Sequence, residues 1–221
     1  MYSLAEENYL KAIFHLSEGG RKNVSTNALA KKLDTKPASV TDMLRKLYEK
    51  ELVAYEKYQG VNISDTGKDY ALMVIRKHRL WETFLVDTLG FGWDEVHSVA
   101  EQLEHIRSHL LIERLDNFLG NPKYDPHGEP IPDAQGNYKL KKRTLVSEMI
   151  KGGSGKIVAV KVSDTSFLHY LDKLKIEIGT HIDLLDIVAF DQSVCLLLNK
   201  KNEVYISNSA ASNIFCELDN T

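Results

Sequence analysis

The sequence predicts an α+β protein in which a helical N-terminal part is followed by a small C-terminal β-barrel. Before residue 120 the apolar residues recur at helical spacing, whereas after residue 143 several short segments alternate apolar and polar residues as strands do. Four of the five prolines lie in 120–138, between these regions, and their density excludes a helix or a central strand there. The 221 residues are enough to bury a sizeable core.

The composition is that of an ordinary globular protein. Apolar residues make up 43% and charged residues 27%, which argues against a fibrous or globally disordered chain. Purely apolar runs such as 194–198 are far shorter than the roughly 20 residues of a membrane span. The acidic N-terminus is unlike a signal peptide, so we expect a cytoplasmic protein without a membrane partner. Cys195 and Cys216 have apolar neighbours and are expected to be reduced core residues.

The first 65 residues predict three helices and a hairpin. Apolar residues at helical spacing predict a helix over 4–16, and Ser25 is placed to cap a short second helix. Pro37 stands at a favourable first helical position, and we expect the third helix over 37–50. The segment 53–64 is typical of a β-hairpin.

This order of elements is that of a winged helix-turn-helix, in which one short helix enters the major groove of DNA. Short or polar side chains suited to base edges gather at the start of the helix 37–50. They are Lys36, Pro37, Ala38, Ser39, Thr41 and Asp42. The segment 21–60 holds nine basic and five acidic residues in a chain of net charge -3, and Lys46 and Lys57 are candidate phosphate contacts. The alternative is a helical bundle with ordinary surface lysines.

Two further helices are expected before the prolines. One runs from residue 65 or 66 to about 88, and Asp94 is placed to cap another that continues to about 119. The second carries an apolar stripe at alternating spacings of three and four residues, namely Val96, Val99, Leu103, Ile106 and Leu110. Such a stripe suits packing on a partner helix, including one across a dimer.

Candidate metal ligands lie opposite this stripe. They are His97, Glu101, Glu104 and His105. Glu101 and His105 are one helical turn apart and can share a cation, and His78 and Glu82 repeat that spacing on the preceding helix. Charged residues opposite an apolar stripe are usually a solvated face, but apolar residues continue this face toward the C-terminus, so we expect it to be covered. Covered carboxylates and imidazoles need a counter-charge, and manganese, iron(II) or zinc suits these ligands.

The proline-rich segment contains two more candidates. Asp125 and His127 lie in the sequence Asp-Pro-His-Gly-Glu-Pro-Ile-Pro, and a segment with this much proline can hold ligands at low entropic cost. The alternative is an ordinary surface turn that serves as a spacer. Beyond it, alternation predicts strands over 156–162 and 181–187, and a small barrel is expected around one short helix near 167–171.

These residues resemble a known family, the metal-dependent repressors that comprise the diphtheria toxin repressor and the manganese transport regulators. Segments 39–47 and 52–61 look like its winged helix. Segments 78–82 and 96–105 look like its metal-binding helices, and 125–132 looks like its connecting loop. The resemblance covers essentially the whole chain, and it implies that the C-terminal part is an SH3-like domain.

The resemblance implies two metal sites. The ligands of the first would be Glu101, Glu104, His105, His78 and Asn8. The manganese regulators carry acidic residues at the positions of Asn8 and Lys11. Asn8 offers a carbonyl oxygen, but a charged Lys11 cannot bind a metal, which argues against a second cation in this pocket. The iron-sensing branch has cysteine at the position of Glu101, so the glutamate here favours manganese.

The second site would use ligands from the helices, the loop and the C-terminal domain. They are Glu82, His97, Asp125, His127 and Asp164. Relatives with a C-terminal domain have cysteine at the position of Asp125 and histidine at that of His127. A cation bound by all of these residues would tie the helical part to the C-terminal domain.

The resemblance implies a homodimeric transcriptional repressor that binds a divalent metal as corepressor and then a palindromic operator in double-stranded DNA. Manganese is favoured over iron, zinc is expected to bind in vitro, and no catalysis is implied. The expected domains are 1–65 (winged helix), 66–120 (dimerisation and metal binding), 121–143 (connecting loop) and 144–221 (SH3-like). The alternatives are a metal-independent winged-helix regulator and a Glu/His metalloenzyme, although no nucleophile or general-base motif is visible.

Overall fold

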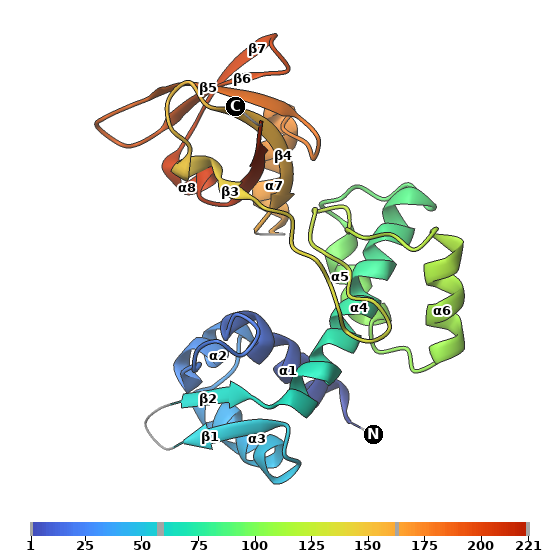
Figure 1. The fold of residues 1–221 in the computed structure, drawn as a ribbon. Coiled ribbons are helices and arrows are strands. Elements are labelled where there is room, and N and C mark those ends of the chain that lie inside the picture. The colour runs from blue at the N-terminus through green and yellow to red at the C-terminus, as the bar shows by residue number, and fades with distance from the viewer. Residues whose placement is uncertain (1, 57–59, 162–163, 220–221) are drawn as a thin grey trace. The chain divides into compact units, whose positions relative to one another are not determined.

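The computed structural model of the protein describes residues 2–56, 60–161 and 164–219 (Figure 1). Contacts divide the chain into two compact units. The first comprises Met1–His78, Glu101–Ile112 and Pro132–Asn137, and the second comprises Arg79–Ala100, Glu113–Ile131 and Tyr138–Thr221. Boundaries between the units fall inside the helices α4, α5 and α6, so each of these helices contributes residues to both units.

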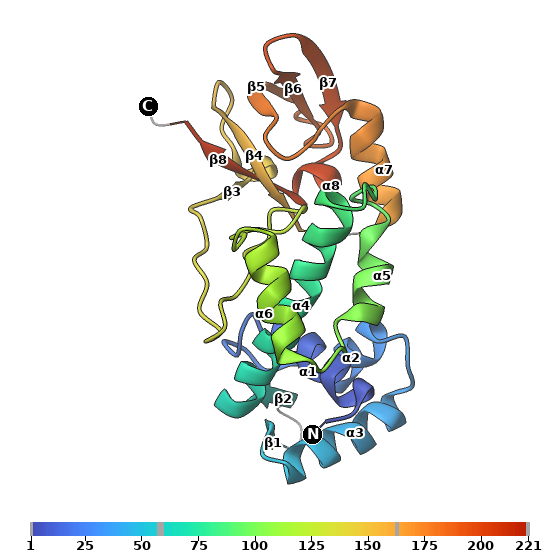
Figure 2. The ribbon, with the colours of Figure 1, turned by 90° about the vertical axis from the view of Figure 1, so that its right-hand side faces the viewer.

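The N-terminal part of the first unit contains three helices and a two-stranded hairpin (Figure 2). The bounds are α1 Leu4–Leu16, α2 Thr26–Lys32, α3 Pro37–Glu49, β1 Val53–Glu56 and β2 Gly60–Ile63. Ser3 and Glu6 form a capping box at the start of α1, and the hydroxyl of Ser25 accepts a hydrogen bond from the backbone N–H of Ala28 in α2. The apolar faces of the three helices share one core with the hairpin. The predicted winged helix-turn-helix is confirmed.

Three more helices follow, and two of them replace a single helix that the sequence predicts. They are α4 Asp65–Asp87, α5 Val96–Leu103 and α6 His109–Phe118. The prediction of one continuous helix over 94–119 is wrong, because the chain forms α5 and α6 there with a turn between them. Ser108 starts α6: its hydroxyl accepts a hydrogen bond from the N–H of Leu111 and its carbonyl one from the N–H of Ile112. The apolar spacing continues through this turn, so periodicity alone does not reveal the break.

The N-terminal end of α5 also differs from the prediction. The helix begins at Val96 rather than directly after an Asp94 cap. The carboxylate of Asp94 instead lies 2.6 Å from Nε2 of His169, and its carbonyl accepts a hydrogen bond from the hydroxyl of Thr165 at 3.2 Å. A long-range partner has therefore replaced the local capping role of Asp94.

Two arginines of α4 hold the proline-rich segment through its carbonyl groups. Arg76 donates to the carbonyl of Pro132 at 2.8 Å, and Arg79 donates to the carbonyl of Pro130. Proline cannot donate a backbone hydrogen bond, but its carbonyl is a normal acceptor. In each unit, the part of the proline-rich segment that belongs to it is thus held against the part of α4 in the same unit.

A tight turn in this segment orients its polar residues. Oδ1 of Asp125 accepts hydrogen bonds from the backbone N–H groups of His127 and Glu129, both at 2.9 Å. Gly128, with φ +81°, completes the turn. A Cβ atom there would lie 1.9 Å from the carbonyl oxygen of Val158, so only glycine fits this approach of the two backbones.

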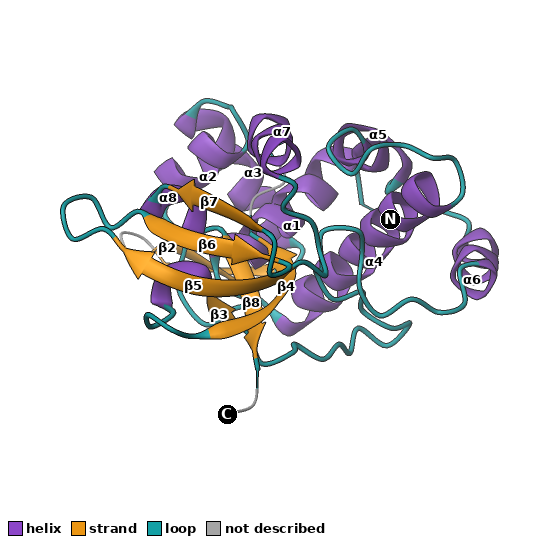
Figure 3. Ribbon diagram, turned by 90° about the horizontal axis from the view of Figure 1, so that it is seen from above, coloured by secondary structure: helices purple, strands orange, loops and turns teal. Residues whose placement is uncertain are grey.

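The C-terminal part of the second unit is a six-stranded antiparallel sheet in the order β3-β8-β4-β5-β6-β7 (Figure 3). The elements are β3 Thr144–Leu145, η1 Val146–Glu148, β4 Ser154–Val160, α7 Thr165–Leu174, β5 His181–Ile187, β6 Val194–Leu198, β7 Asn202–Ile206, α8 Asn208–Ala211 and β8 Ile214–Leu218. The sheet and the two short helices enclose a second apolar core. Cys195 and Cys216 are buried free thiols, as predicted. Among the described residues, no helix combines the length and apolar character that crossing a membrane requires.

Candidate metal centre and DNA-binding surface

The candidate DNA-reading residues lie on one exposed surface of α3 and the turn before it. The buried face of the helix packs Val40, Leu44 and Leu47 into the N-terminal core. The exposed residues are Lys36, Pro37, Ala38, Ser39, Thr41, Asp42 and Lys46. Small and polar side chains at the start of a helix can approach base edges closely, whereas the lysines can contact phosphate. Lys57, the other predicted phosphate contact, lies outside the described residues.

The first group of candidate ligands is organised around Lys11, and we call Glu7, Lys11, His78, Glu104 and His105 the Lys11 cluster. Nζ of Lys11 lies 2.7 and 2.8 Å from the two carboxylate oxygens of Glu104, whose side chain is 0% exposed. On its other side, Oε2 of Glu104 lies 2.5 Å from Nδ1 of His78. Nδ1 of His105 lies 2.5 Å from Oε2 of Glu7. The cluster therefore joins α1, α4 and the turn after α5.

The charges of the Lys11 cluster are compensated by the chain itself. Burial alone raises the pKa of Glu104, but the hydrogen bond from His78 and the charge of Lys11 outweigh it and hold this pKa below its usual value. A second ammonium group, Lys77, is buried, and its pKa is lowered by burial despite the attraction of Glu7 and Glu104. Two buried carboxylates, Glu7 and Glu104, thus interact with two lysines, Lys11 and Lys77.

Two residues predicted for the first site occupy more open positions. The Glu101 side chain is 52% exposed and its Oε1 lies 3.8 Å from Nζ of Lys11. Asn8 is exposed on α1. Sequence reasoning did not single out Glu7, which is buried beside His105 and accepts a hydrogen bond from the Tyr70 hydroxyl at 3.0 Å. Its position three residues before Leu10 and seven before Phe14, both buried in α1, is the signal that places Glu7 on the buried face.

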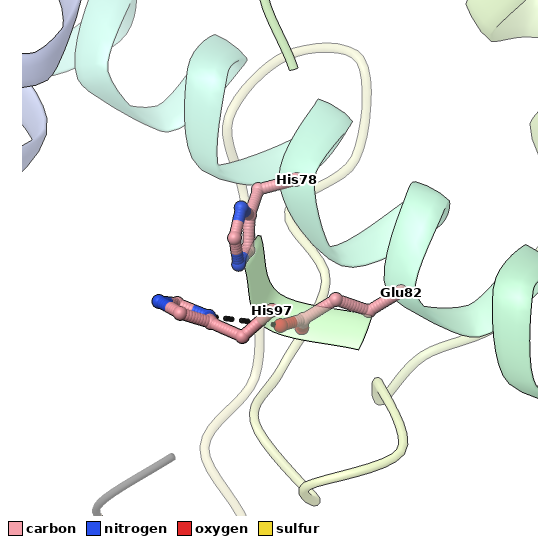
Figure 4. Close-up of side chains that lie close together, drawn as sticks. All are labelled: His78, Glu82 and His97. Carbon is pink, nitrogen blue, oxygen red and sulfur yellow. Dashed lines mark hydrogen bonds and ion pairs between the residues drawn. The ribbon is translucent and has the colours of Figure 1, made fainter. Parts of the chain in front are cut away.

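The second group, which we call the loop cluster, consists of Glu82 in α4 and of Asp125 and His127 in the proline-rich turn. All three are buried, and their ligand atoms lie within 4.8 Å of one another. Nδ1 of His127 lies 3.6 Å from Oε2 of Glu82. The other oxygen of Glu82 lies 3.2 Å from Nδ1 of His97, which projects from α5 (Figure 4). His78, drawn with them in Figure 4, lies one turn before Glu82 on α4.

The loop cluster holds two buried carboxylates close together. Burial and the nearby charge of Glu82 raise the pKa of Asp125 to about 6, even though Arg79 lies 3.5 Å from its Oδ2. Burial lowers the pKa of His127, but the Glu82 carboxylate more than offsets this, so the net shift is upward. Arg79 also lies 3.5 Å from Glu129, so its charge is shared between two carboxylates.

The ring of His127 is oriented as a metal ligand requires. Nε2 lies 2.8 Å from the carbonyl oxygen of Trp93, and because a carbonyl only accepts, Nε2 carries the proton. In the neutral ring, Nδ1 then presents its lone pair on the side of Glu82. A hydrogen bond from the second imidazole nitrogen is the usual way in which a protein fixes a ligating histidine. Two carboxylates and one imidazole, without a thiolate, fit manganese, iron(II) or zinc.

Asp164 does not join this cluster. Its carboxylate caps α7 by accepting hydrogen bonds from the backbone N–H groups of Ser166 and Phe167, at 2.9 and 3.2 Å. The hydrogen bond from the Ser166 hydroxyl and these backbone hydrogen bonds lower the pKa of Asp164. A metal role for the exposed Asp164 stays a prediction; its Oδ1 accepts the hydrogen bonds that cap α7.

Three family descriptions match successive parts of the chain. "Iron dependent repressor, N-terminal DNA binding domain" matches residues 1–61, and "Iron dependent repressor, metal binding and dimerisation domain" matches residues 64–133. "FeoA domain" matches residues 144–218. The winged helix, the helices with the candidate ligands and the C-terminal sheet therefore each correspond to one of these domains.

Individual relatives agree with these matches. The iron-dependent repressor IdeR of Mycobacterium tuberculosis is 34% identical over 126 residues, 57% of this chain and 54% of that protein. The diphtheria toxin repressor of Corynebacterium diphtheriae is 31% identical over 126 residues, 57% of this chain and 55% of that protein. The chain spans about half the length of the curated relatives it matches.

Two solved structures are similar over nearly the whole chain. A manganese-dependent transcriptional repressor in complex with manganese has a TM-score of 0.88 and 33% identity, covering 96% of this chain and 98% of that one. The manganese regulator SloR has a TM-score of 0.80 and 32% identity, covering 97% and 98%. The chain belongs to the family of iron- and manganese-dependent transcriptional repressors.

Proposed function

We propose that this chain is a metal-dependent transcriptional repressor that binds a divalent metal as corepressor and then, as a homodimer, a palindromic operator in double-stranded DNA. The observation that carries the proposal is the loop cluster, in which Glu82, Asp125 and His127 are buried together with their ligand atoms within 4.8 Å. Two buried carboxylates and an imidazole at this spacing are expected to bind a cation.

The donor set supports manganese as the favoured metal, with iron(II) next and zinc able to bind in vitro. Oxygen donors suit manganese well, and a neutral imidazole suits all three metals. The bound metal would supply positive charge that holds Glu82 and Asp125 together. His97, at 3.2 Å from Glu82, is placed to add a nitrogen ligand or to orient that carboxylate.

A cation at the loop cluster would join parts of the second unit that are distant in sequence. Glu82 belongs to α4, whereas the carbonyl of His127 accepts a hydrogen bond from the N–H of Val160 in β4 at 3.0 Å. Binding would therefore fasten α4 to the turn that is attached to the C-terminal sheet. A metal regulates DNA binding to the extent that it binds the DNA-competent state more tightly, which is a population shift.

The experiment is operator binding, measured by fluorescence anisotropy, in chelator and with added manganese or iron(II). We expect weak binding in chelator and recovery by about 5- to 150-fold with metal, the usual range of allosteric coupling. His127→Ala should abolish the recovery, whereas His169→Ala, which changes an exposed histidine of the same unit, should preserve it. Equal operator affinity with and without chelator would identify a metal-independent regulator instead.

A further inference from the structure

The Lys11 cluster contains a permanent cation where the family resemblance implies a metal site. Nζ of Lys11 contacts both oxygens of Glu104 at 2.7 and 2.8 Å, and it is also 3.8 Å from Glu101. Glu104 is fully buried and the Lys11 side chain is only 15% exposed, so solvent screens this pair weakly. One ammonium group thus occupies the side of Glu104 that faces α1.

We infer that Lys11 acts as a built-in counter-ion in place of a metal at this cluster, so that α1 is fastened to the turn after α5 without metal and the metal response resides in the loop cluster. This inference rests on the proposed function, because it assigns the regulatory metal to one of the two groups of ligands. It reaches further, because it makes the attachment of the DNA-binding part to Glu104 independent of metal.

The contacts around Glu104 already engage its carboxylate and therefore oppose the binding of a metal ion. One side of its carboxylate is taken by Lys11, and its Oε2 also lies 2.5 Å from Nδ1 of His78. A divalent cation entering here would have to separate Lys11 from Glu104 and then lie close to the displaced ammonium. The divalent cation and the ammonium group of Lys11 would repel each other, and in a buried site this repulsion is strong.

The remaining members of the Lys11 cluster are also engaged with one another. His105 directs Nδ1 to Glu7 at 2.5 Å, and Tyr70 donates its hydroxyl hydrogen to the same residue at 3.0 Å. Lys77, buried on α4, experiences the charges of both Glu7 and Glu104. These interactions connect α1 to α4 and to the segment after α5 through protein groups alone.

The loop cluster offers the opposite arrangement. Its arginine, Arg79, is 3.5 Å from Asp125 and is shared with Glu129. A cation there relieves repulsion between two carboxylates instead of competing with an ammonium group. The two clusters should therefore differ in metal content under the same conditions.

The first test is the manganese stoichiometry of the full chain, measured by the electron paramagnetic resonance signal of free Mn²⁺ during titration. Wild type and Glu104→Gln should bind the same number of ions per chain, and His127→Ala should bind one fewer. Lys11→Glu should bind one more than wild type, whereas Lys22→Glu should not; Lys22 makes an exposed pair with Glu18 and carries the same charge change. Loss of one Mn²⁺ in Glu104→Gln would overturn the inference.

The second test needs no variant with an added acid. Amide hydrogen exchange of α1 should show the same protection in chelated and in manganese-loaded wild type, and Lys11→Met should lose this protection in both states. Protection that appears only with manganese, and disappears in Glu104→Gln, would overturn the inference. Failure of the proposed function is a separate result, namely operator affinity that does not respond to manganese at all.

Discussion

The Lys11 cluster and the loop cluster each contain a buried carboxylic acid, but the pKa of this acid is lowered in the first cluster and raised in the second. Glu104 is in bidentate contact with an ammonium group, and its pKa is below the usual value. Oδ2 of Asp125 lies 3.5 Å from Nε of Arg79, and the pKa of Asp125 is raised to about 6. Burial disfavours the charged form in both places, so the neighbouring Glu82 carboxylate beside Asp125 and the closer positive partners of Glu104 explain the difference.

This difference distinguishes a cluster that stabilises the fold, the Lys11 cluster, from one that is suited to a regulatory metal, the loop cluster. A buried carboxylate with a close lysine is stable in its ionised form and gains little from an added ion. A pair of buried carboxylates with a shared and more distant arginine gains more from a divalent ion, because both charges need compensation. Ligand-type residues alone therefore do not identify a regulatory site; the positive charge already present has to be counted.

Replacing Lys11 by methionine should give the largest effect. Removing one partner of a buried ion pair costs about 3–5 kcal/mol, because the other charge is left without compensation. We expect a loss of that size in the free energy of unfolding, measured by urea denaturation in chelator. The double variant Lys11→Met/Glu104→Gln should recover part of the loss, and Lys22→Met, which breaks an exposed pair, should cost about 0.5 kcal/mol or less. If Lys11→Met and Lys22→Met lowered the free energy of unfolding equally, the contrast between the buried and the exposed lysine would be contradicted.

Replacing Asp125 by alanine should weaken manganese binding by more than about 100-fold, because a direct ligand matters more than the residues that orient ligands. The matched control is Asp133→Ala, which removes an exposed aspartate from the same proline-rich segment and breaks its hydrogen bonds to Asn137. Isothermal titration calorimetry measures both affinities. An unchanged affinity in Asp125→Ala would move the metal away from the loop cluster.

Acidification should distinguish the two clusters. The pKa of Asp125 is about 6 and that of His127 is raised, and both groups must lose a proton to bind a metal. Manganese affinity should therefore fall as pH decreases from 7 through 6, by up to about tenfold per pH unit for each proton that competes. The lowered pKa of Glu104 keeps the Lys11 pair charged in this range, so its stabilising contribution is lost only at lower pH. A flat manganese affinity between pH 7 and 5 would contradict this assignment.

Changes on the exposed face of α3 should leave both clusters intact and alter only DNA binding. Lys46→Ala should weaken binding to all sequences and lower the salt dependence by about one counter-ion, whereas Ser39→Ala should change sequence preference. Both variants should keep the wild-type response to manganese. Operator binding measured at several salt concentrations and with mismatched operators checks the distinction, and identical behaviour of the two variants would show that α3 is not the reading helix.

Most of the fold was accessible from local sequence signals. Ser25 and Pro37 mark the starts of α2 and α3, and the hairpin follows from its strand pattern. The break between α5 and α6 was not accessible, because the apolar spacing continues through it while Ser108 supplies the new start. Local capping signals are reliable only where no distant group competes, as the pairing of Asp94 with His169 illustrates.

The sequence predicts which residues are candidate ligands, but it does not predict which of them lie together in space. The ion pair between Lys11 and Glu104 joins residues 93 positions apart, and periodicity carries no information about such a partner. The charge of a lysine already excludes Lys11 as a metal ligand, but only the structure shows which carboxylate Lys11 neutralises. Arg79 escaped notice for the same reason, since its role near Asp125 depends on how the proline-rich turn approaches α4.

The most direct measurement is anomalous X-ray diffraction near the manganese absorption edge from crystals grown with excess manganese. An ion should appear with Glu82, Asp125 and His127 as ligands, and Nζ of Lys11 should remain within hydrogen-bond distance of Glu104. An ion bound to Glu104 with Lys11 displaced, and no ion at His127, would contradict the assignment of the metal response to the loop cluster.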